Sequence, residues 1–143
     1  MAKLTVKTDV HLGPQDTWDR ASNLQEFDKW LMVHEGWRGE LPETLTVGTV
    51  ITSVVTVKGL RNRVRWTIKE YDAPNRIVLR GDGKGGVKLG LAVEVKAKNG
   101  VSEMAFTIEL GGAPLFGPIG SSVARALKGD IEKSLRTFSD LYA

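Results

Sequence analysis

The sequence contains no cysteine among its 143 residues. This absence excludes disulfide bonds, thiolate metal sites and cysteine nucleophiles, and it fits a reducing compartment. The chain also lacks a long apolar run, since none approaches the roughly 18 to 20 residues needed to cross a bilayer. Its N-terminal segment, MAKLTVKTDV, has no signal-peptide core. We therefore expect a cytoplasmic protein without a transmembrane segment.

The net charge of the chain is also small. Lysine and arginine number 20 and aspartate and glutamate 17, which gives a net charge of +3. This charge supports solubility and does not favour nucleic acid as a partner. The sequence has no Walker lysine motif, HExxH or GxSxG, so we expect no cofactor and no metal site. The length and ordinary composition predict one globular domain over residues 1–143.

Alternating apolar and polar residues predict an antiparallel sheet. Leu4, Val6, Val10 and Leu12 share one parity, which indicates a first strand buried on one face. Turn signals such as Asn99-Gly100 separate the later strands, so these should form a meander with one buried face. The predicted later strands span residues 47–57, 61–71, 76–80, 87–97 and 101–110, after a brief extended segment at 37–41.

Helical spacing of apolar residues appears in two places. Residues 14–31 predict two short helices that are split near Ser22-Asn23, and residues 119–142 predict a helix of about 24 residues. The apolar stripe of the long helix needs a partner, and only the inner face of the meander is large enough. The sequence therefore predicts an α+β fold, in which a curved antiparallel sheet of six or seven strands surrounds the C-terminal helix.

This order of elements resembles the helix-grip fold of the START/polyketide cyclase/Bet v 1 (SRPBCC) superfamily. Five segments make the resemblance more specific: KLTV at 3–6, FDKWL at 27–31 with His34 soon after, VKGLRNR at 57–63, GDG and GGVK between 81 and 88, and GGAPLFGPIG at 111–120. Together they are similar to an actinobacterial subfamily that includes the toxin of a mycobacterial type II toxin–antitoxin pair. The resemblance covers almost the whole chain.

The superfamily resemblance implies a pocket between sheet and helix for lipids, polyketides or other apolar molecules. Because the same scaffold serves carriers, enzymes and regulators, three functions follow as expectations. The first is binding of a small hydrophobic or amphipathic ligand. The second is a toxin with an antitoxin protein as its partner, and the third is a polyketide cyclase or dehydrase.

Two polar residues are candidates for contact with such a ligand. His34 follows the second short helix, where an imidazole could act as acid or base, with Glu35 adjacent in sequence. A structural or exposed histidine is the alternative. Asn62 has the parity of Val64 and Trp66, so it is either a polar contact for the ligand or satisfied within the turn at residues 59–60.

Aromatic and aliphatic residues complete the candidate site. Trp18 is expected in the core, whereas Trp37 and Trp66 fit both core packing and a ligand-binding wall. We expect the glycine-rich loop at 111–118 either to expose Leu115 and Phe116 near the predicted cavity mouth or to use these residues to staple the start of the long helix. The full set of predicted ligand-binding residues is His34, Trp37, Asn62, Trp66, Leu89, Leu91, Phe106, Phe116, Ile119 and Val123.

Two further patterns receive a simpler interpretation. Residues 81–86 contain GxGxxG, but the alternating residues from Val87 onward predict a strand where a dinucleotide fingerprint needs a helix. We therefore expect a glycine hairpin. The basic residues Arg61, Arg63, Arg65 and Lys69 share the outward parity, which indicates a solvated face, with contact to RNA, anionic lipid or an acidic protein as the alternative.

Overall fold

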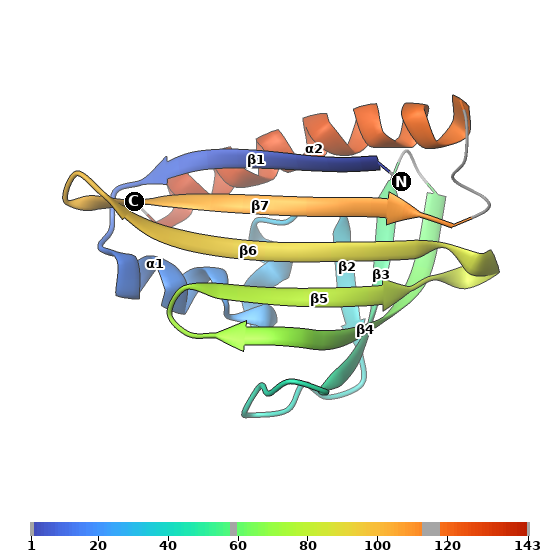
Figure 1. The fold of residues 1–143 in the computed structure, drawn as a ribbon, viewed down its shortest axis with the longest axis horizontal. Coiled ribbons are helices and arrows are strands. Elements are labelled where there is room, and N and C mark those ends of the chain that lie inside the picture. Colours follow the sequence, from blue (N-terminus) through green and yellow to red (C-terminus); the bar gives the residue numbers. More distant parts are fainter. Residues whose placement is uncertain (1, 58–59, 113–117, 143) are drawn as a thin grey trace.

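The computed structural model describes residues 2–57, 60–112 and 118–142, and the side chains of these except residues 2, 60 and 118–120. Within them, seven strands form one antiparallel sheet in the spatial order β1-β7-β6-β5-β4-β3-β2. This confirms the predicted sheet (Figure 1). The strands are β1 (Ala2–Val10), β2 (His34–Arg38), β3 (Val50–Val57), β4 (Leu60–Asp72), β5 (Arg76–Asp82), β6 (Lys88–Lys98) and β7 (Val101–Gly111).

The helices also follow the predicted order. In the described ranges they are α1 (Pro14–Ala21), the 3-10 helices η1 (Leu24–Lys29) and η2 (Lys84–Gly86), and α2 (Pro118–Tyr142). The break at Ser22-Asn23 is confirmed, because Ser22 ends α1 and the side chain of Asn23 accepts a hydrogen bond from Gln25 N at the start of η1. None of these described helices is both long and apolar enough to span a lipid bilayer.

The strand β2 differs from the sequence prediction. The extended segment was expected at 37–41, but β2 begins at His34 and ends at Arg38, so Trp37 lies inside a strand and not at its start. Pairing with β3 sets these bounds, with an irregular register between His34 and Gly36. Tertiary pairing thus outweighs local preference at this edge of the sheet.

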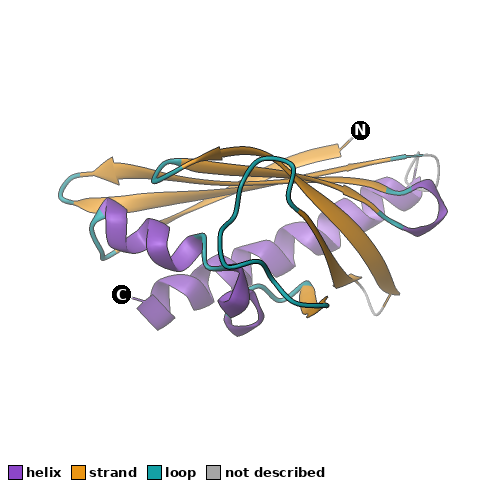
Figure 2. Cartoon of the chain, turned by 90° about the horizontal axis from the view of Figure 1, so that it is seen from below, coloured by secondary structure: helices purple, strands orange, loops and turns teal. Residues whose placement is uncertain are grey.

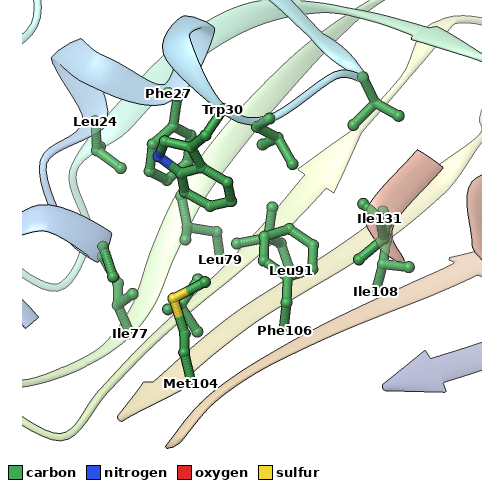
Figure 3. Close-up of a cluster of buried hydrophobic side chains, with 14 of the residues drawn as sticks. Leu24, Phe27, Trp30, Ile77, Leu79, Leu91, Met104, Phe106, Ile108 and Ile131 are labelled. Atoms are coloured by element: carbon green, nitrogen blue, oxygen red, sulfur yellow. The ribbon is translucent and has the colours of Figure 1, made fainter. Parts of the chain in front are cut away.

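All three longer helices lie on the concave side of the sheet (Figure 2). The predicted stripe of α2 is buried there, with Leu127, Ile131, Leu135 and Phe138 each no more than 1% exposed. Burial of a side chain of this size contributes roughly 1.5–3 kcal/mol to stability. Figure 3 shows the part of this core beneath η1, where Leu24, Phe27 and Trp30 lie over Leu79, Leu91, Met104 and Phe106.

The outer face of the sheet is charged. On β1, β5, β6 and β7 its lysines and arginines lie beside carboxylates, as in the pairs Arg80–Glu109 and Arg76–Glu94. The basic residues of β4 are exposed on the same side, as their parity predicted. The sheet therefore presents one solvated face and one apolar face, and the apolar face is the one that meets α2.

Candidate functional site

A cavity of about 320 Å³ lies between the concave face of the sheet and α2. Residues from η1, from β2 to β7 and from α2 contribute to its wall, so it depends on the complete fold. The described lining is mainly apolar and consists of Phe27, Leu31, Val33, His34, Trp37, Ser53, Val55, Val57, Asn62, Trp66, Leu79, Val87, Leu89, Leu91, Ile108, Leu110, Val123 and Leu127.

The lining residues differ in their burial, and this difference shows which part of the wall is more exposed. Leu79 and Leu127 are no more than 2% exposed and form the floor. By contrast, Val57, Val87 and Val123 are half-buried. These three residues lie at the end of β3, just before β6 and near the start of α2. Among the described residues, the cavity wall is therefore more exposed at the end of the molecule where those segments meet.

His34 lies in the cavity wall at the edge of the sheet. Its side chain is 8% exposed, and its ring packs 4.6 Å from that of Trp37 and 6.0 Å from that of Phe27, between centroids. Burial lowers the pKa of His34 below its usual value of 6.5, although the nearby Asp28 carboxylate opposes the shift. The imidazole is therefore neutral at pH 7 and offers one donor and one acceptor.

Glu35, the sequence neighbour of His34, faces the other side of the sheet. Its Oε2 accepts hydrogen bonds from Thr56 Oγ1 at 2.7 Å and Arg61 Nε at 3.0 Å, and its Oε1 accepts one from Arg61 Nη2 at 2.6 Å. The bonds from Thr56 and Arg61 lower the pKa of Glu35. Glu35 therefore stays ionised on the outer face and does not act with His34 as an acid–base pair.

Asn62 faces the cavity from β4. Its Oδ1 accepts a hydrogen bond from Lys84 N at 2.9 Å, so it has a structural partner in η2. The alternative turn at residues 59–60 includes Gly59, which lies outside the described residues. Among the described residues, no hydrogen bond satisfies its Nδ2. Asn62 thus anchors a turn with one amide atom and keeps a donor for another group.

Two tryptophans form part of the wall, with their indole nitrogens already bonded. Trp66 Nε1 donates to Ser53 Oγ at 2.8 Å, and Trp37 Nε1 donates to the carbonyl of Leu24 at 2.6 Å. Both rings consequently offer apolar surface to the cavity. Trp18 belongs to the core, as predicted, where it is 3% exposed and packs edge-on against Tyr71.

Gly81, the first residue of the glycine-rich segment at 81–86, packs against the cavity-wall residue Trp66. Gly81 lies within β5 opposite Trp66, where an added Cβ would come within 2.6 Å of Val64 Cγ1 and 2.8 Å of Trp66 Cε3. Gly85 and Gly86 adopt positive φ values of 73° and 87° in η2, which glycine favours. The segment then enters β6, so it is a turn between strands, as expected.

The structure brings together most of the predicted residues. The predicted members that line the cavity are His34, Trp37, Asn62, Trp66, Leu89, Leu91 and Val123. Phe106 does not belong with them: its ring is fully buried and packs against Trp30, whose ring centroid is 6.2 Å away. Phe116 and the side chain of Ile119 lie outside the described residues.

Several lining residues were missed by the sequence analysis. They are Phe27, Leu31, Val33, Ser53, Val55, Val57, Leu79, Val87, Ile108, Leu110 and Leu127. Parity carried a usable signal for the β3 members, because Ser53, Val55 and Val57 alternate with outward-facing residues. Helical spacing over residues 14–31 marked Leu31 as apolar but did not place it at the cavity, and no comparable local signal was available for Val33; both residues lie in the connection before β2.

Solved structures share this architecture. A START superfamily protein from Mycobacterium smegmatis superposes with a TM-score of 0.77 at 12% identity, covering 99% of both chains. TTHA0849 from Thermus thermophilus gives a TM-score of 0.77 at 15% identity, covering 97% of this chain and 95% of its own. These low identities establish the fold alone, and that fold is the predicted helix grip.

Sequence relatives extend the likeness to the whole chain. Rv1546 of Mycobacterium tuberculosis, described as an uncharacterized protein, is 48% identical over 142 residues, or 99% of both chains. Toxin Rv0910 of the same organism is 47% identical over 143 residues, covering all of this chain and 99% of the toxin. The model of one family matches residues 1–142. The chain therefore belongs to the SRPBCC superfamily, in the family described as polyketide cyclase/dehydrase and lipid transport.

Proposed function

We propose that the protein binds a small hydrophobic or amphipathic molecule in the cavity between the sheet and α2. The observation that supports this most directly is the composition of the described wall, in which only His34, Ser53 and Asn62 interrupt apolar side chains and indole rings. Burial of apolar ligand surface supplies affinity, at about 25 cal/mol per Å². The few polar groups orient the ligand, as in most small-molecule sites.

A cavity-filling substitution tests this function. Val55 lines the cavity, whereas Val50 lies on the same strand with 45% of its surface exposed. Val55→Phe should therefore weaken binding of the neutral fluorescent probe N-phenylnaphthylamine at least tenfold, and Val50→Phe should leave it unchanged. Native mass spectrometry of protein purified without detergent should also detect a bound apolar molecule. Wild-type protein that carries no such mass and binds no probe would rule the proposal out.

A second candidate function comes from the relative named as a toxin, which is 47% identical over the whole chain. In this case the protein would inhibit growth, and an antitoxin protein would neutralise it. Induction in a mycobacterial host, alone and together with the neighbouring gene, would test this activity. Unchanged growth in both cases would count against it. Comparing Val55→Phe with Val50→Phe in the same assay would show whether inhibition requires an open cavity.

Catalysis is a third candidate, and it would use His34. The family description includes cyclases and dehydrases, and a neutral imidazole in the wall can accept a proton from a bound substrate. The carboxylate of Glu35 is bonded elsewhere, so the imidazole lacks that partner. Ligand binding is therefore the function that the geometry favours. Turnover of a polyketide substrate that is lost in His34→Gln, with binding retained, would favour the enzyme instead.

A further inference from the structure

The cavity wall lacks charge wherever the structure describes it. No lysine, arginine, aspartate or glutamate is among the described lining residues. Charged neighbours in the sequence turn away, because Glu35 and Arg61 pair on the outer face. An ionised ligand group would therefore be buried without a counterion, which is costly. The cavity is suited to an uncharged molecule.

The hydrogen-bonding groups that remain available define the ligand further. The indole N–H groups of Trp37 and Trp66 are already bonded to Leu24 O and Ser53 Oγ, and Asn62 Oδ1 is bonded to Lys84 N. In contrast, neither the imidazole of His34 nor the Asn62 Nδ2 atom has a hydrogen bond to any described residue. A ligand that reaches both can bond at two points.

These two residues occupy one row across the sheet. His34 lies opposite Val55 in the pairing of β2 with β3, and Val55 lies opposite Asn62 in the pairing of β3 with β4. Since neighbouring strands are about 4.8 Å apart, the Cα atoms of His34 and Asn62 are separated by about 10 Å. The isopropyl group of Val55 fills the interval. The row thus alternates polar, apolar and polar.

From this row we infer that the ligand is an uncharged molecule with two oxygen functions separated by an apolar segment, one held at His34 and the other at Asn62. The inference rests on the proposed binding function and specifies its ligand class. The buried His34 would hold the inner function, and the half-buried Asn62 would hold the function nearer the more exposed end. Carboxylates and amines of the same length would be excluded.

Matched compounds of one chain length test this inference. Displacement of N-phenylnaphthylamine at about pH 8 would be measured with dodecane-1,6-diol, dodecanol, methyl dodecanoate, dodecanoate and dodecylamine. Dodecanol and the methyl ester should bind at least tenfold more tightly than the two ions, because burial of an unpaired charge is unfavourable. The diol should exceed dodecanol by about threefold or more, the usual effect of one added hydrogen bond.

Substitutions assign the two contact points. His34→Phe and Asn62→Leu should each abolish the advantage of the diol over dodecanol, whereas His11→Phe, which alters an exposed histidine, should preserve it. Thermal melting would check that each variant folds, and either variant reports independently if the other does not.

Dodecanoate binding as tightly as dodecanol would overturn the inference and leave the proposed function intact. A diol without advantage in the wild type would overturn the two-point contact. Failure of every compound, the probe included, would overturn both the inference and the proposed function.

Discussion

Trp66 donates its indole N–H to the hydroxyl of Ser53 in the buried wall of the cavity, with Nε1 and Oγ 2.8 Å apart. The bond runs diagonally from β4 to β3, since Trp66 pairs with Ile51 and Ser53 pairs with Val64. It fixes the ring of Trp66 while its apolar surface lines the cavity. Stability and ligand space therefore depend on the same pair of side chains.

Ser53→Ala should destabilise the protein by about 1–3 kcal/mol, because it leaves a buried indole N–H without its partner. Urea unfolding followed by tryptophan fluorescence would measure the change. Thr52→Ala, on the next residue and the opposite face, should change the free energy of unfolding by less than about 0.5 kcal/mol. Equal losses in the two variants would contradict this role of Ser53.

Gly81→Ala should both destabilise the fold and reshape the cavity. The new methyl group would lie 2.6 Å from Val64 Cγ1 and 2.8 Å from Trp66 Cε3, so the indole must shift. Overpacking of this kind costs about 1–3 kcal/mol. We expect a lower melting temperature and an altered affinity for N-phenylnaphthylamine. Gly13→Ala is the control, since a methyl group there meets nothing within 4 Å, and it should leave probe affinity unchanged.

Ser134→Ala should loosen the connection that leads to His34. The buried Ser134 Oγ accepts a hydrogen bond from Met32 N at 2.9 Å and donates one to Asp130 O at 2.7 Å. Removing the hydroxyl leaves the Met32 N–H unpaired, at a cost of about 1–3 kcal/mol. Hydrogen exchange at Met32 should then be faster.

Thr137 provides the matched control on the same helix. Its hydroxyl also donates to the carbonyl four residues earlier, that of Lys133, but it is exposed. Thr137→Ala should therefore leave exchange at Met32 unchanged. Acceleration of that exchange in Thr137→Ala would show that a general weakening of α2 is responsible.

The pH dependence of stability should reveal the buried imidazole of His34. Burial lowers its pKa in the folded chain below the value of 6.5 expected when unfolded, so between these two values the unfolded chain binds more protons. The contribution of neutral His34 to the stability of the folded chain is fully present above about pH 6.5. It is lost as the pH falls toward the folded-state pKa, and below that value it changes no further.

Urea unfolding between about pH 5 and 8 would measure this effect, since histidine titrates in that range. His34→Gln should flatten the slope, whereas His11→Gln, at an exposed position, should retain it. An unchanged slope in His34→Gln would mean that other groups produce the pH dependence.

Much of the fold was predictable because faces follow from periodicity. Leu89 and Leu91 share a parity that placed them on the inner face, and the stripe of α2 predicted its burial. The same pattern did not predict which inward-facing residues line the cavity and which are buried in the core. Phe106 also faces inward, but Trp30 seals it into the core. Parity identifies the face of a strand, whereas the part of that face that stays open depends on which helix covers it.

The contacts around His34 were not predictable for a related reason. Glu35 adjoins His34 in sequence, yet its partner is Arg61 on another strand. The hydrogen bond from Lys84 N to Asn62 likewise joins distant segments. Such pairs are set by strand register, which local propensity does not reveal. The candidate residue types could thus be selected from the sequence, but their partners required the fold.

The sheet order has a consequence for the growing chain. Strand β1 pairs with β7, so it cannot join the sheet until β7 has been synthesised. Since α2 supplies one wall of the cavity, the cavity also forms late in synthesis. Until α2 leaves the ribosome, this helix cannot cover the apolar concave face of the sheet. Exposed strand edges and apolar surface favour aggregation. We therefore expect the chain to be prone to aggregation until α2 docks on this face.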